Sequence, residues 1–336
     1  MKETILVTGG TGFIGSHTTV ELQNAGYEVV IADDLSNSQA DVVDGIEKIT
    51  GIRPAFEKVD LRDFDATEAL FKKYPKISGI IHFAANKAVG ESVEKPLMYY
   101  RNNIISLVNL LELMPKYDVK GIIFSSSCTV YGQPDVLPAT EDSPVKKAES
   151  PYGNTKQINE EIIHDYVRSG APIQSIILRY FNPIGSHPTA IIGEMPNGVP
   201  QNLIPYLTQT AIGIREQLSV FGDDYNTPDG SCIRDYIYVV DLAKAHVCAM
   251  TRIMENQIEE PVEIFNIGTG TGTSVLELIN TFEKATGVKL NYKIVGRRPG
   301  DIEKVWGNVD KANKVLGWKA DTPLDEVLAS AWKWQC

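Results

Sequence analysis

The chain has 336 residues, of which 43% are hydrophobic, and a formal net charge of −11 at pH 7. This charge argues against nucleic acid as a partner, because nonspecific binding needs clustered Lys and Arg, whereas an anionic small substrate would need a local cationic pocket. No apolar run approaches the roughly 18 residues that span a bilayer, and the N-terminus lacks a signal-peptide pattern, so we expect a soluble, cytoplasmic protein without a membrane partner.

The first predicted unit is a buried strand over residues 4–7, a glycine-rich turn over 8–15 and a helix over 14–24. A glycine fingerprint in this strand–turn–helix context predicts a dinucleotide site. Gly10 is expected to permit the tight turn, and Gly12 to let backbone N–H groups approach a pyrophosphate. Gly15 would let the helix pack close to the strand, with its N-terminus toward the phosphates.

The next predicted strand, residues 28–32, ends in Asp33, about 20 residues beyond the glycines. A carboxylate there can accept both ribose hydroxyls of adenosine. This position favours NAD over NADP, because Asp33 and Asp34 would repel a 2′-phosphate. The alternative is that Asp33 only begins the polar loop 33–38.

The first half of the chain continues to alternate strands and helices. This rhythm predicts an α/β fold: a Rossmann-like, doubly wound parallel sheet with helices on both faces. Ligands are then expected at the carboxyl ends of the strands. The further strands are expected over 55–59, 79–83, 121–124 and 175–179, and the helices near 65–73, 97–114 and 152–168.

Beyond Tyr180, prolines and glycines crowd residues 183–205 and predict a smaller, loop-rich α/β lobe that binds the substrate. We expect an NAD-binding Rossmann domain over residues 1–182 and a substrate-binding lobe over 183–336. A strand over 236–240, followed by a helix, and a strand over 264–267 are candidates to return to the first domain.

A second motif, Tyr152 to Lys156, places a phenol and an ammonium four residues apart on one helix face. The cation favours the phenolate, and together with a positively charged nicotinamide it is expected to lower the pKa of Tyr152 toward the working range, so that Tyr152 acts as proton carrier. Ser127, after the strand 121–124, is the candidate hydroxyl that orients the reacting group. An isolated Tyr-x-x-x-Lys match is more often an ordinary helix surface, but the dinucleotide fingerprint in the same chain favours redox chemistry.

Cysteine and histidine spacing argues against metal and disulfide chemistry. The four cysteines show no C-x-x-C pair, and the five histidines show no ligand spacing such as H-E-x-x-H. We therefore expect no metal and a reducing compartment.

These motifs resemble the extended short-chain dehydrogenase/reductases and, within them, the UDP-glucose 4-epimerases. The resemblance runs nearly end to end and implies tightly held NAD. It also implies reversible epimerisation at C4 of a UDP-hexose through a 4-keto sugar, with a hydride passed to NAD and returned. The segments that carry it are residues 8–15, 82–92, 99–103, 124–132, 150–153, 179–183 and 234–237.

By this resemblance Tyr152 would be the base, Lys156 its electrostatic partner and ribose ligand, and Ser127 the hydroxyl contact. The resemblance also implies a nucleotide-sugar substrate for the second lobe. The NAD site would be formed by Gly9, Gly12, Phe13, Ile14, Gly15, Asp33, Asn37, Asp60, Leu61, Phe83, Ala84, Lys87, Asn102, Ser125, Tyr152, Lys156 and Tyr180.

A buried diphosphate needs fixed cations, and Arg234 and Arg298 supply guanidinium groups. The alternative for Arg234 is a salt bridge with Asp235. By resemblance the substrate would also be bound by Ser127, by Asn182 near the sugar phosphate, by Asn202 and Leu203 at the uridine, by Phe221 beside it and by Asp301 at its ribose.

Two positions depart from the family pattern. Val305 stands where forms restricted to unacetylated sugars tend to carry Tyr, so we hypothesise that UDP-N-acetylgalactosamine and UDP-N-acetylglucosamine are also accepted. Asn86 stands where an apolar residue is frequent.

Other functions of the same fold remain as alternatives. One is a UDP-glucuronate 4-epimerase, which pocket cations alone would separate, and another is a different NAD-dependent nucleotide-sugar oxidoreductase of the same fold. An ordinary dehydrogenase would release NADH in stoichiometric turnover. A dehydratase is disfavoured because Cys128 and Thr129 replace the Asp-Glu pair that it needs. An NAD-binding sensor without catalysis is a further alternative. A homodimer is expected, formed by helices 97–114 and 152–168 as in relatives.

Overall fold

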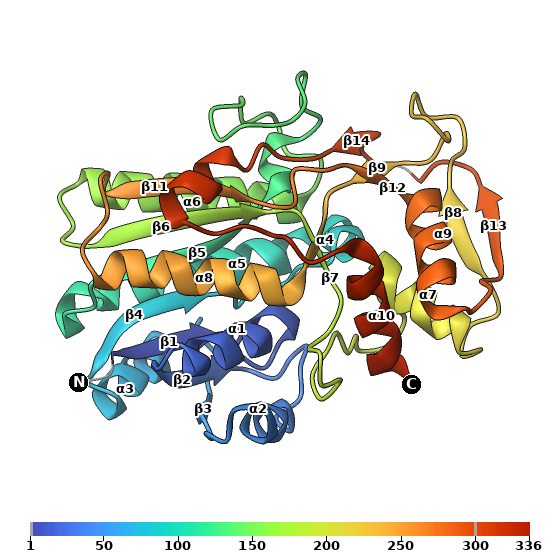
Figure 1. The fold of residues 1–336 in the computed structure, drawn as a ribbon. Helices are drawn as coiled ribbons and strands as arrows, with labels where there is room; N and C mark the ends of the chain where they lie inside the picture. Colours follow the sequence, from blue (N-terminus) through green and yellow to red (C-terminus); the bar gives the residue numbers. More distant parts are fainter. Residues whose placement is uncertain (1–2, 299–300) are drawn as a thin grey trace.

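The computed structural model describes residues 3–298 and 301–336 (Figure 1). Its centre is a seven-stranded sheet in which all neighbouring strands are parallel, as predicted for a doubly wound α/β fold. The strand order is β11-β6-β5-β4-β1-β2-β3. The strands are β1 (Thr4–Thr8), β2 (Glu28–Asp33), β3 (Ala55–Lys58), β4 (Ile77–His82), β5 (Gly121–Ser127), β6 (Gln174–Tyr180) and β11 (Val262–Ile267).

Helices cover both faces of this sheet (Figure 1). Successive side chains of a strand point to opposite faces, so Ile5 and Val7 of β1 pack into one core and Leu6 packs into the other. The first core lies under α1 (Phe13–Asn24), α2 (Val42–Thr50) and α8 (Val239–Met254). The second lies under α3 (Phe64–Lys73), α5 (Pro96–Leu113) and α6 (Pro151–Arg168), and α4 (Val89–Glu94) packs on α5 and α6.

The last strand of the sheet comes from late in the chain. β11 pairs with β6 along its whole length, from Val262 against Ser175 to Ile267 against Tyr180. α8, which precedes it, packs on α1 over the first core. β11 therefore completes the sheet that residues 4–180 begin, whereas the other candidate strand, β10 (Tyr236–Tyr238), pairs with β7 (Asn182–Ile184) in a separate sheet.

The predicted strand over 236–240 is wrong in its second half. β10 ends at Tyr238, and α8 begins at Val239, with Tyr238 in an extended conformation at the helix N-cap. Val239 and Val240 are β-branched and favour strands by themselves. They are buried on the helix in the core of the second lobe, and this tertiary packing overrides the local preference.

The smaller lobe, at the right of Figure 1, has its own core around Leu207, Val220, Leu278, Phe282 and Leu328. Its helix α9 begins with a capping box between Ser274 and Glu277, which satisfies backbone donors at both positions. Its elements are β7 (Asn182–Ile184), α7 (Leu203–Ala211), β8 (Leu218–Phe221), β9 (Ile233–Arg234), β10 (Tyr236–Tyr238), β12 (Thr273–Ser274), α9 (Val275–Thr286), β13 (Tyr292–Val295), β14 (Lys304–Val305) and α10 (Leu324–Gln335).

Two kinds of feature are absent from residues 3–298 and 301–336. None of the helices there is both long and apolar enough to serve as a membrane span. The same residues contain no group of three or more His, Cys, Asp and Glu side chains arranged to hold a metal ion.

Candidate active site

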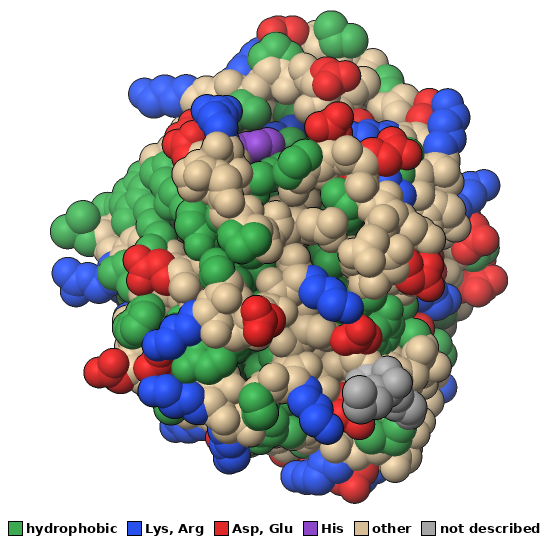
Figure 2. Space-filling model, turned by 90° about the vertical axis from the view of Figure 1, so that its left-hand side faces the viewer, with side chains coloured by type: hydrophobic (Ala, Val, Ile, Leu, Met, Phe, Trp, Pro, Cys, Tyr) green, Lys and Arg blue, Asp and Glu red, His purple; other side chains and the backbone are tan. Residues whose placement is uncertain are grey.

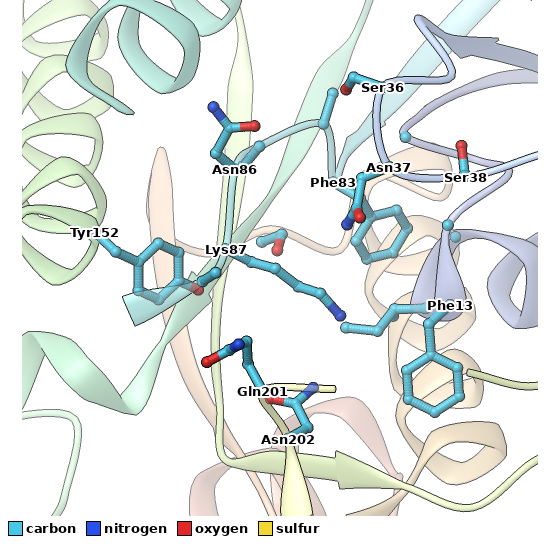
Figure 3. Close-up of a pocket in the computed structure, with 18 of the residues that line it drawn as sticks. Phe13, Ser36, Asn37, Ser38, Phe83, Asn86, Lys87, Tyr152, Gln201 and Asn202 are labelled. Carbon is cyan, nitrogen blue, oxygen red and sulfur yellow. The ribbon is translucent and has the colours of Figure 1, made fainter. Parts of the chain in front are cut away.

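A cavity of about 970 Å³ opens at the carboxyl ends of the central strands (Figure 3). It is bordered by the β1–α1 turn, the ends of β2, β4 and β5, the start of α6 and residues 193–202. Of the residues predicted from the sequence, those that line it are Gly9, Gly12, Phe13, Ile14, Gly15, Asp33, Asn37, Asp60, Leu61, Phe83, Ala84, Lys87, Asn102, Ser125, Ser127, Tyr152, Lys156, Tyr180, Asn182, Asn202, Arg234 and Val305.

The glycine turn at the start of α1 packs closely on its surroundings, and the N-terminus of the helix has no side-chain cap. A Cβ on Gly15 would lie 2.3 Å from the carbonyl oxygen of Gly9, and one on Gly9 would lie 2.8 Å from the backbone nitrogen of Ala84. Gly12 is the N-cap of α1 and provides no side-chain cap, so the first backbone N–H groups of the helix are available to a ligand. The turn therefore fits the pyrophosphate of a dinucleotide.

The tight turn depends on Gly9 rather than on Gly10, for which the sequence predicted this role. Gly9 has the positive φ, +69°, that a side chain would disfavour, and its N–H donates to the carbonyl of Ala32 at 2.8 Å. Gly10 instead lies against Ile31, which would be 2.8 Å from an added Cβ. The turn conformation depends on Gly9, and Gly10 is required by packing of the turn on β2.

Asp33, at the end of β2, is buried and held in place from both of its oxygens. One accepts a bond from the N–H of Thr11 at 3.2 Å, and the other from the N–H of Leu35 at 2.9 Å and the hydroxyl of Ser38 at 3.1 Å. Asp33 thus does organise the polar loop, as the alternative interpretation held. It also lines the cavity, where its fixed carboxylate fits the ribose hydroxyls of adenosine.

Ser127, Tyr152 and Lys156 come together at one wall of the cavity. Ser127 is the last residue of β5, and Tyr152 follows the Ser150 cap, whose hydroxyl accepts the N–H of Gly153 at 3.1 Å. The Lys156 ammonium lies 5.8 Å from the centre of the Tyr152 ring and donates to the carbonyl of Ser125 at 2.5 Å. Lys156 is only 3% exposed, which rules out an ordinary helix surface at this motif.

Burial dominates the titration of this pair. It raises the pKa of Tyr152 to about 12, against a hydrogen bond with Ser127 that acts to lower it. Burial lowers the pKa of Lys156 to about 8, against the negative charge of Glu160. The Lys156 ammonium by itself does not lower the pKa of Tyr152, because desolvation of the phenolate outweighs its neighbours, and the predicted decrease also depends on the positive charge of the nicotinamide. Tyr152 is therefore neutral at pH 7 in this arrangement.

Two predicted residues flank this wall. The hydroxyl of Tyr180, at the end of β6, forms a hydrogen bond with the hydroxyl of Ser125. Lys87 extends its ammonium into the cavity between Tyr152 and Phe13 (Figure 3). It lies 3.3 Å from Glu194, and Glu194 accepts a bond from the Asn202 amide at 2.6 Å. The sequence analysis missed Glu194, whose only local signal is a loop position among prolines and glycines.

Asn86, whose role the sequence left open, is joined to the helices through its backbone. Asn103 of α5 accepts from the N–H of Asn86 at 2.8 Å, donates to its carbonyl at 3.1 Å and donates to Thr155 of α6 at 3.0 Å. This network fixes the segment after β4 against α6. The side chain of Asn86 borders the cavity (Figure 3).

A second group of predicted residues lies beside the cavity rather than on its wall. Arg298 pairs with Asp301 at 2.7 Å, and its guanidinium lies 5.3 Å from the centre of the Phe221 ring. Leu203 begins α7, directly after Asn202. The four residues Leu203, Phe221, Arg298 and Asp301 are absent from the cavity lining. Residues 299 and 300, between Arg298 and Asp301, lie outside the described residues.

Arg234 is not paired with Asp235. Asp235 accepts bonds from the N–H groups of Thr269 at 2.8 Å and Gly270 at 3.1 Å, and Arg234 donates to the carbonyl of Ile233 at 2.8 Å. Within the described ranges, Arg234 forms no ion pair, so the salt-bridge alternative is wrong. Its guanidinium lines the cavity as a cation that an anionic ligand can use.

Val305 lies opposite Arg234 in the pairing of β14 with β9. It is 3% exposed and packs with Cys128 and Phe181 in a small apolar cluster that also borders the cavity. The size of Val305 therefore affects the space near the cavity wall that carries Ser127, Tyr152 and Lys156.

Comparison with known proteins agrees with this geometry. The sequence pattern of the NAD dependent epimerase/dehydratase family matches residues 5–268. UDP-glucose 4-epimerase of Bacillus subtilis is 50% identical over 98% of this chain and 96% of its own length, and the human UDP-glucose 4-epimerase is 46% identical over 100% and 97%.

The solved structures agree with the sequences. The UDP-glucose 4-epimerase of Bifidobacterium longum in complex with NAD⁺ and UDP has a TM-score of 0.94 at 47% identity, over 99% of this chain and 98% of that one. The enzyme of Stenotrophomonas maltophila with NAD and formylated UDP-arabinopyranose has a TM-score of 0.95 at 45% identity, over the same shares. The resemblance predicted from the sequence is confirmed, and the chain belongs to the NAD dependent epimerase/dehydratase family, among its UDP-glucose 4-epimerases.

Proposed function

We propose that this chain is an isomerase that interconverts UDP-galactose and UDP-glucose by reversible epimerisation at C4, through a 4-keto sugar and with bound NAD. The observation that carries this proposal is the convergence of Ser127, Tyr152 and Lys156 on one cavity with the glycine turn and Asp33. Relatives that share 45–47% of the sequence bind NAD together with UDP or a UDP-sugar in their solved structures.

Bound NAD supplies a hydride acceptor that later returns the hydride to the other face of the same carbon. The chain's own residues bind this cofactor and orient the sugar. We propose that backbone N–H groups of the glycine turn hold the pyrophosphate, that Asp33 holds the adenosine ribose and that Lys156 holds the second ribose. The remaining predicted NAD ligands line the same cavity, which supports their assignment.

Tyr152 is proposed to take the proton from the sugar 4-hydroxyl and to give it back. Because burial disfavours the phenolate, the proton can leave only when positive charge faces the phenol, and the ammonium of Lys156 provides part of that charge. Ser127, whose side-chain oxygen accepts the N–H of Thr129 at 3.2 Å, is proposed to orient the reacting oxygen beside Tyr152.

The nucleotide end of the substrate is proposed to lie toward the smaller lobe. Arg234 and Asn182 would contact the diphosphate and its sugar, and Asn202 would contact the uridine. The group of Leu203, Phe221, Arg298 and Asp301 lies beyond the cavity wall, and we propose that its ion pair opens toward uridine and ribose when substrate enters. On this basis we divide the chain into an NAD-binding domain, residues 1–182 with α8 and β11, and a nucleotide-sugar-binding lobe formed by the rest of residues 183–336.

The four cysteines, Cys128, Cys232, Cys248 and Cys336, are free thiols. Free thiols that include an exposed one, Cys336, are typical of a reducing environment. This supports a cytoplasmic location.

The test is incubation of the purified protein with UDP-galactose and no added NAD, followed by separation of the hexoses released from the product. We expect a mixture of galactose and glucose and no accumulation of NADH. An ordinary dehydrogenase would instead need added NAD and would release NADH, and a glucuronate-specific epimerase would act only on UDP-glucuronate. Either result would contradict the proposal.

Val305 leads to a prediction on sugar specificity. A valine leaves more room beside the C2 substituent than a tyrosine, so we expect the wild type to epimerise UDP-N-acetylglucosamine and UDP-N-acetylgalactosamine as well. Val305→Tyr should lose at least about tenfold in kcat/KM for the N-acetylated pair, while the unacetylated pair changes little, because a bulky group discriminates by clash. Assays on all four sugars check this, and a wild type inactive on both N-acetylated sugars would contradict it.

We further propose that the enzyme is a homodimer. Figure 2 shows hydrophobic side chains gathered at the left of this view, toward the side of the molecule on which α5 and α6 lie in Figure 1. The exposed apolar residues of α4 and α5 include Val93 and Leu97, which are 62% and 78% exposed. A patch of this kind favours an interface with another protein surface.

Light scattering should give twice the 37.0 kDa of one chain. Leu97→Glu should shift the mass to one chain, because it places a charge in the interface. Ile214→Glu is the control, since Ile214 is 64% exposed but follows α7 in the other lobe. A single-chain mass for the wild type would overturn the proposal.

A further inference from the structure

Glu160 is a buried acid on the same side of α6 as Tyr152 and Lys156. Tyr152, Lys156 and Glu160 follow one another at four-residue spacing, so their side chains share one side of the helix. Glu160 accepts two bonds from the guanidinium of Arg179 on β6, at 3.0 Å and 2.6 Å. The side chains of Glu160 and Arg179 are 7% and 5% exposed. This pair ties the helix that carries Tyr152 to the central sheet.

Glu160 also holds β5 directly beside the catalytic serine. The same carboxylate accepts a bond from the hydroxyl of Ser126. Ser125 and Ser127, on either side, line the cavity, whereas Ser126 points the other way, as alternation along a strand requires. Ser125 provides the carbonyl that Lys156 contacts, and Ser127 the hydroxyl proposed to orient the sugar. A single carboxylate therefore positions both neighbours of Ser126.

The titratable and aromatic side chains around Lys156 come from four elements. Tyr152 and Glu160 lie on its own helix, His82 lies on β4, Tyr180 on β6, and the ring of Phe124 on β5 is 5.0 Å from the ammonium. Burial lowers the pKa of His82 to about 3 and raises the pKa of Tyr180, so both are neutral near pH 7. Glu160 is the anion of this set.

Arg179 and the groups behind it complete the surroundings of Glu160. Arg179 also donates to the hydroxyl of Tyr131 at 3.1 Å and to the backbone carbonyl of Glu141 at 3.2 Å. Burial raises the pKa of Tyr131 to about 12, so it is neutral as well. The Glu160–Arg179 pair is thus fully hydrogen-bonded, as a buried ion pair must be to persist.

We propose that Glu160 is a positioning residue for the reaction: its carboxylate fixes the end of β5 through Ser126 and favours the charged form of Lys156. This inference rests on the proposed function, because it assigns Glu160 a part in the same proton transfer. It predicts two separable effects, one on geometry and one on the pH dependence of turnover.

The charge effect is tested with Glu160→Gln. Glu160 raises the pKa of Lys156, so without that charge Lys156 loses its proton at lower pH. The alkaline limb of the pH profile of kcat/KM should therefore move down by about one pH unit. The matched control is Glu263→Gln, since Glu263 forms an equally buried double contact with Arg252, at 2.7 Å and 2.8 Å, away from the cavity. It should lower the midpoint of thermal unfolding but leave the limb unchanged.

The geometric effect is tested with Ser126→Ala, which leaves the Glu160–Arg179 pair intact. We expect kcat to fall roughly tenfold, with a smaller change in KM, because the hydroxyl of Ser127 at the end of β5 is then misplaced relative to the reacting oxygen. Glu160→Asp keeps the charge with a shorter side chain. It should keep the wild-type alkaline limb at a lower kcat.

A readout independent of turnover is the titration of Lys156. It is measured as the extent to which acetic anhydride acetylates Lys156 at a series of pH values, quantified by mass spectrometry. A lower midpoint in Glu160→Gln than in Glu263→Gln supports the proposal, even if the wild type failed to epimerise UDP-galactose and the proposed function fell. Equal midpoints in the two variants, together with wild-type kcat in Ser126→Ala, would overturn it. If Glu160→Gln does not fold, wild-type kcat in both Ser126→Ala and Glu160→Asp would overturn the proposal instead.

Discussion

Tyr152→Phe is expected to lower kcat for UDP-galactose by about 10²- to 10⁴-fold, the usual contribution of a positioned acid or base. Phenylalanine keeps the ring in the cavity wall and removes only the oxygen that would carry the proton. NAD content and the midpoint of thermal unfolding should stay close to those of the wild type, because the glycine turn and Asp33, which are proposed to hold most of the cofactor, are unchanged. The measurement is the initial rate of hexose interconversion.

Tyr166→Phe is the control for this loss. Tyr166 is on the same helix, α6, but is partly buried against the second core and does not line the cavity. It should turn over at close to the wild-type rate. A Tyr152→Phe enzyme as fast as Tyr166→Phe would remove Tyr152 from the mechanism.

Gly15→Ala is expected to lose both bound NAD and about 3 kcal/mol of the free energy of unfolding, the upper range for overpacking a filled site. The new methyl would lie 2.3 Å from the carbonyl oxygen of Gly9 and 2.7 Å from the Cα of Gly10. Both atoms belong to the backbone of the turn, so relief requires α1 to move away from β1. That movement would also displace the N–H groups proposed to bind the pyrophosphate.

Denaturant unfolding and the absorbance of NAD released from the denatured protein measure the two effects. Gly296→Ala is the control, because nothing lies within 4 Å of the added carbon there. If Gly15→Ala kept its NAD and its stability, α1 would have to approach the turn less closely than the structure shows.

The parts of the site that follow from local spacing could be predicted. The glycine turn, Asp33 and the pair Tyr152–Lys156 depend on a strand–turn–helix unit and on one helical repeat, so short segments suffice to place them. The fold class follows from the alternation of strands and helices for the same reason, and the relatives and their structures confirm it.

Contacts between distant segments could not be predicted. Glu194 meets Lys87 across 107 positions, and Glu160 meets Arg179 only because α6 and β6 pack together. The extent to which burial raises the pKa of Tyr152 could not be predicted either, because spacing shows a neighbouring cation but not the amount of burial. The start of α8 was misplaced because two valines favour a strand by themselves.

The late arrival of β11 has a consequence for synthesis on the ribosome. Until residue 267 has emerged, the backbone of β6 faces outward as an unpaired strand edge, which other nascent chains can join. The N-terminal half therefore cannot complete its fold while the second half is still being made, and a fragment cut near residue 182 would tend to aggregate. Although the two lobes have separate cores, the chain has to fold as one unit.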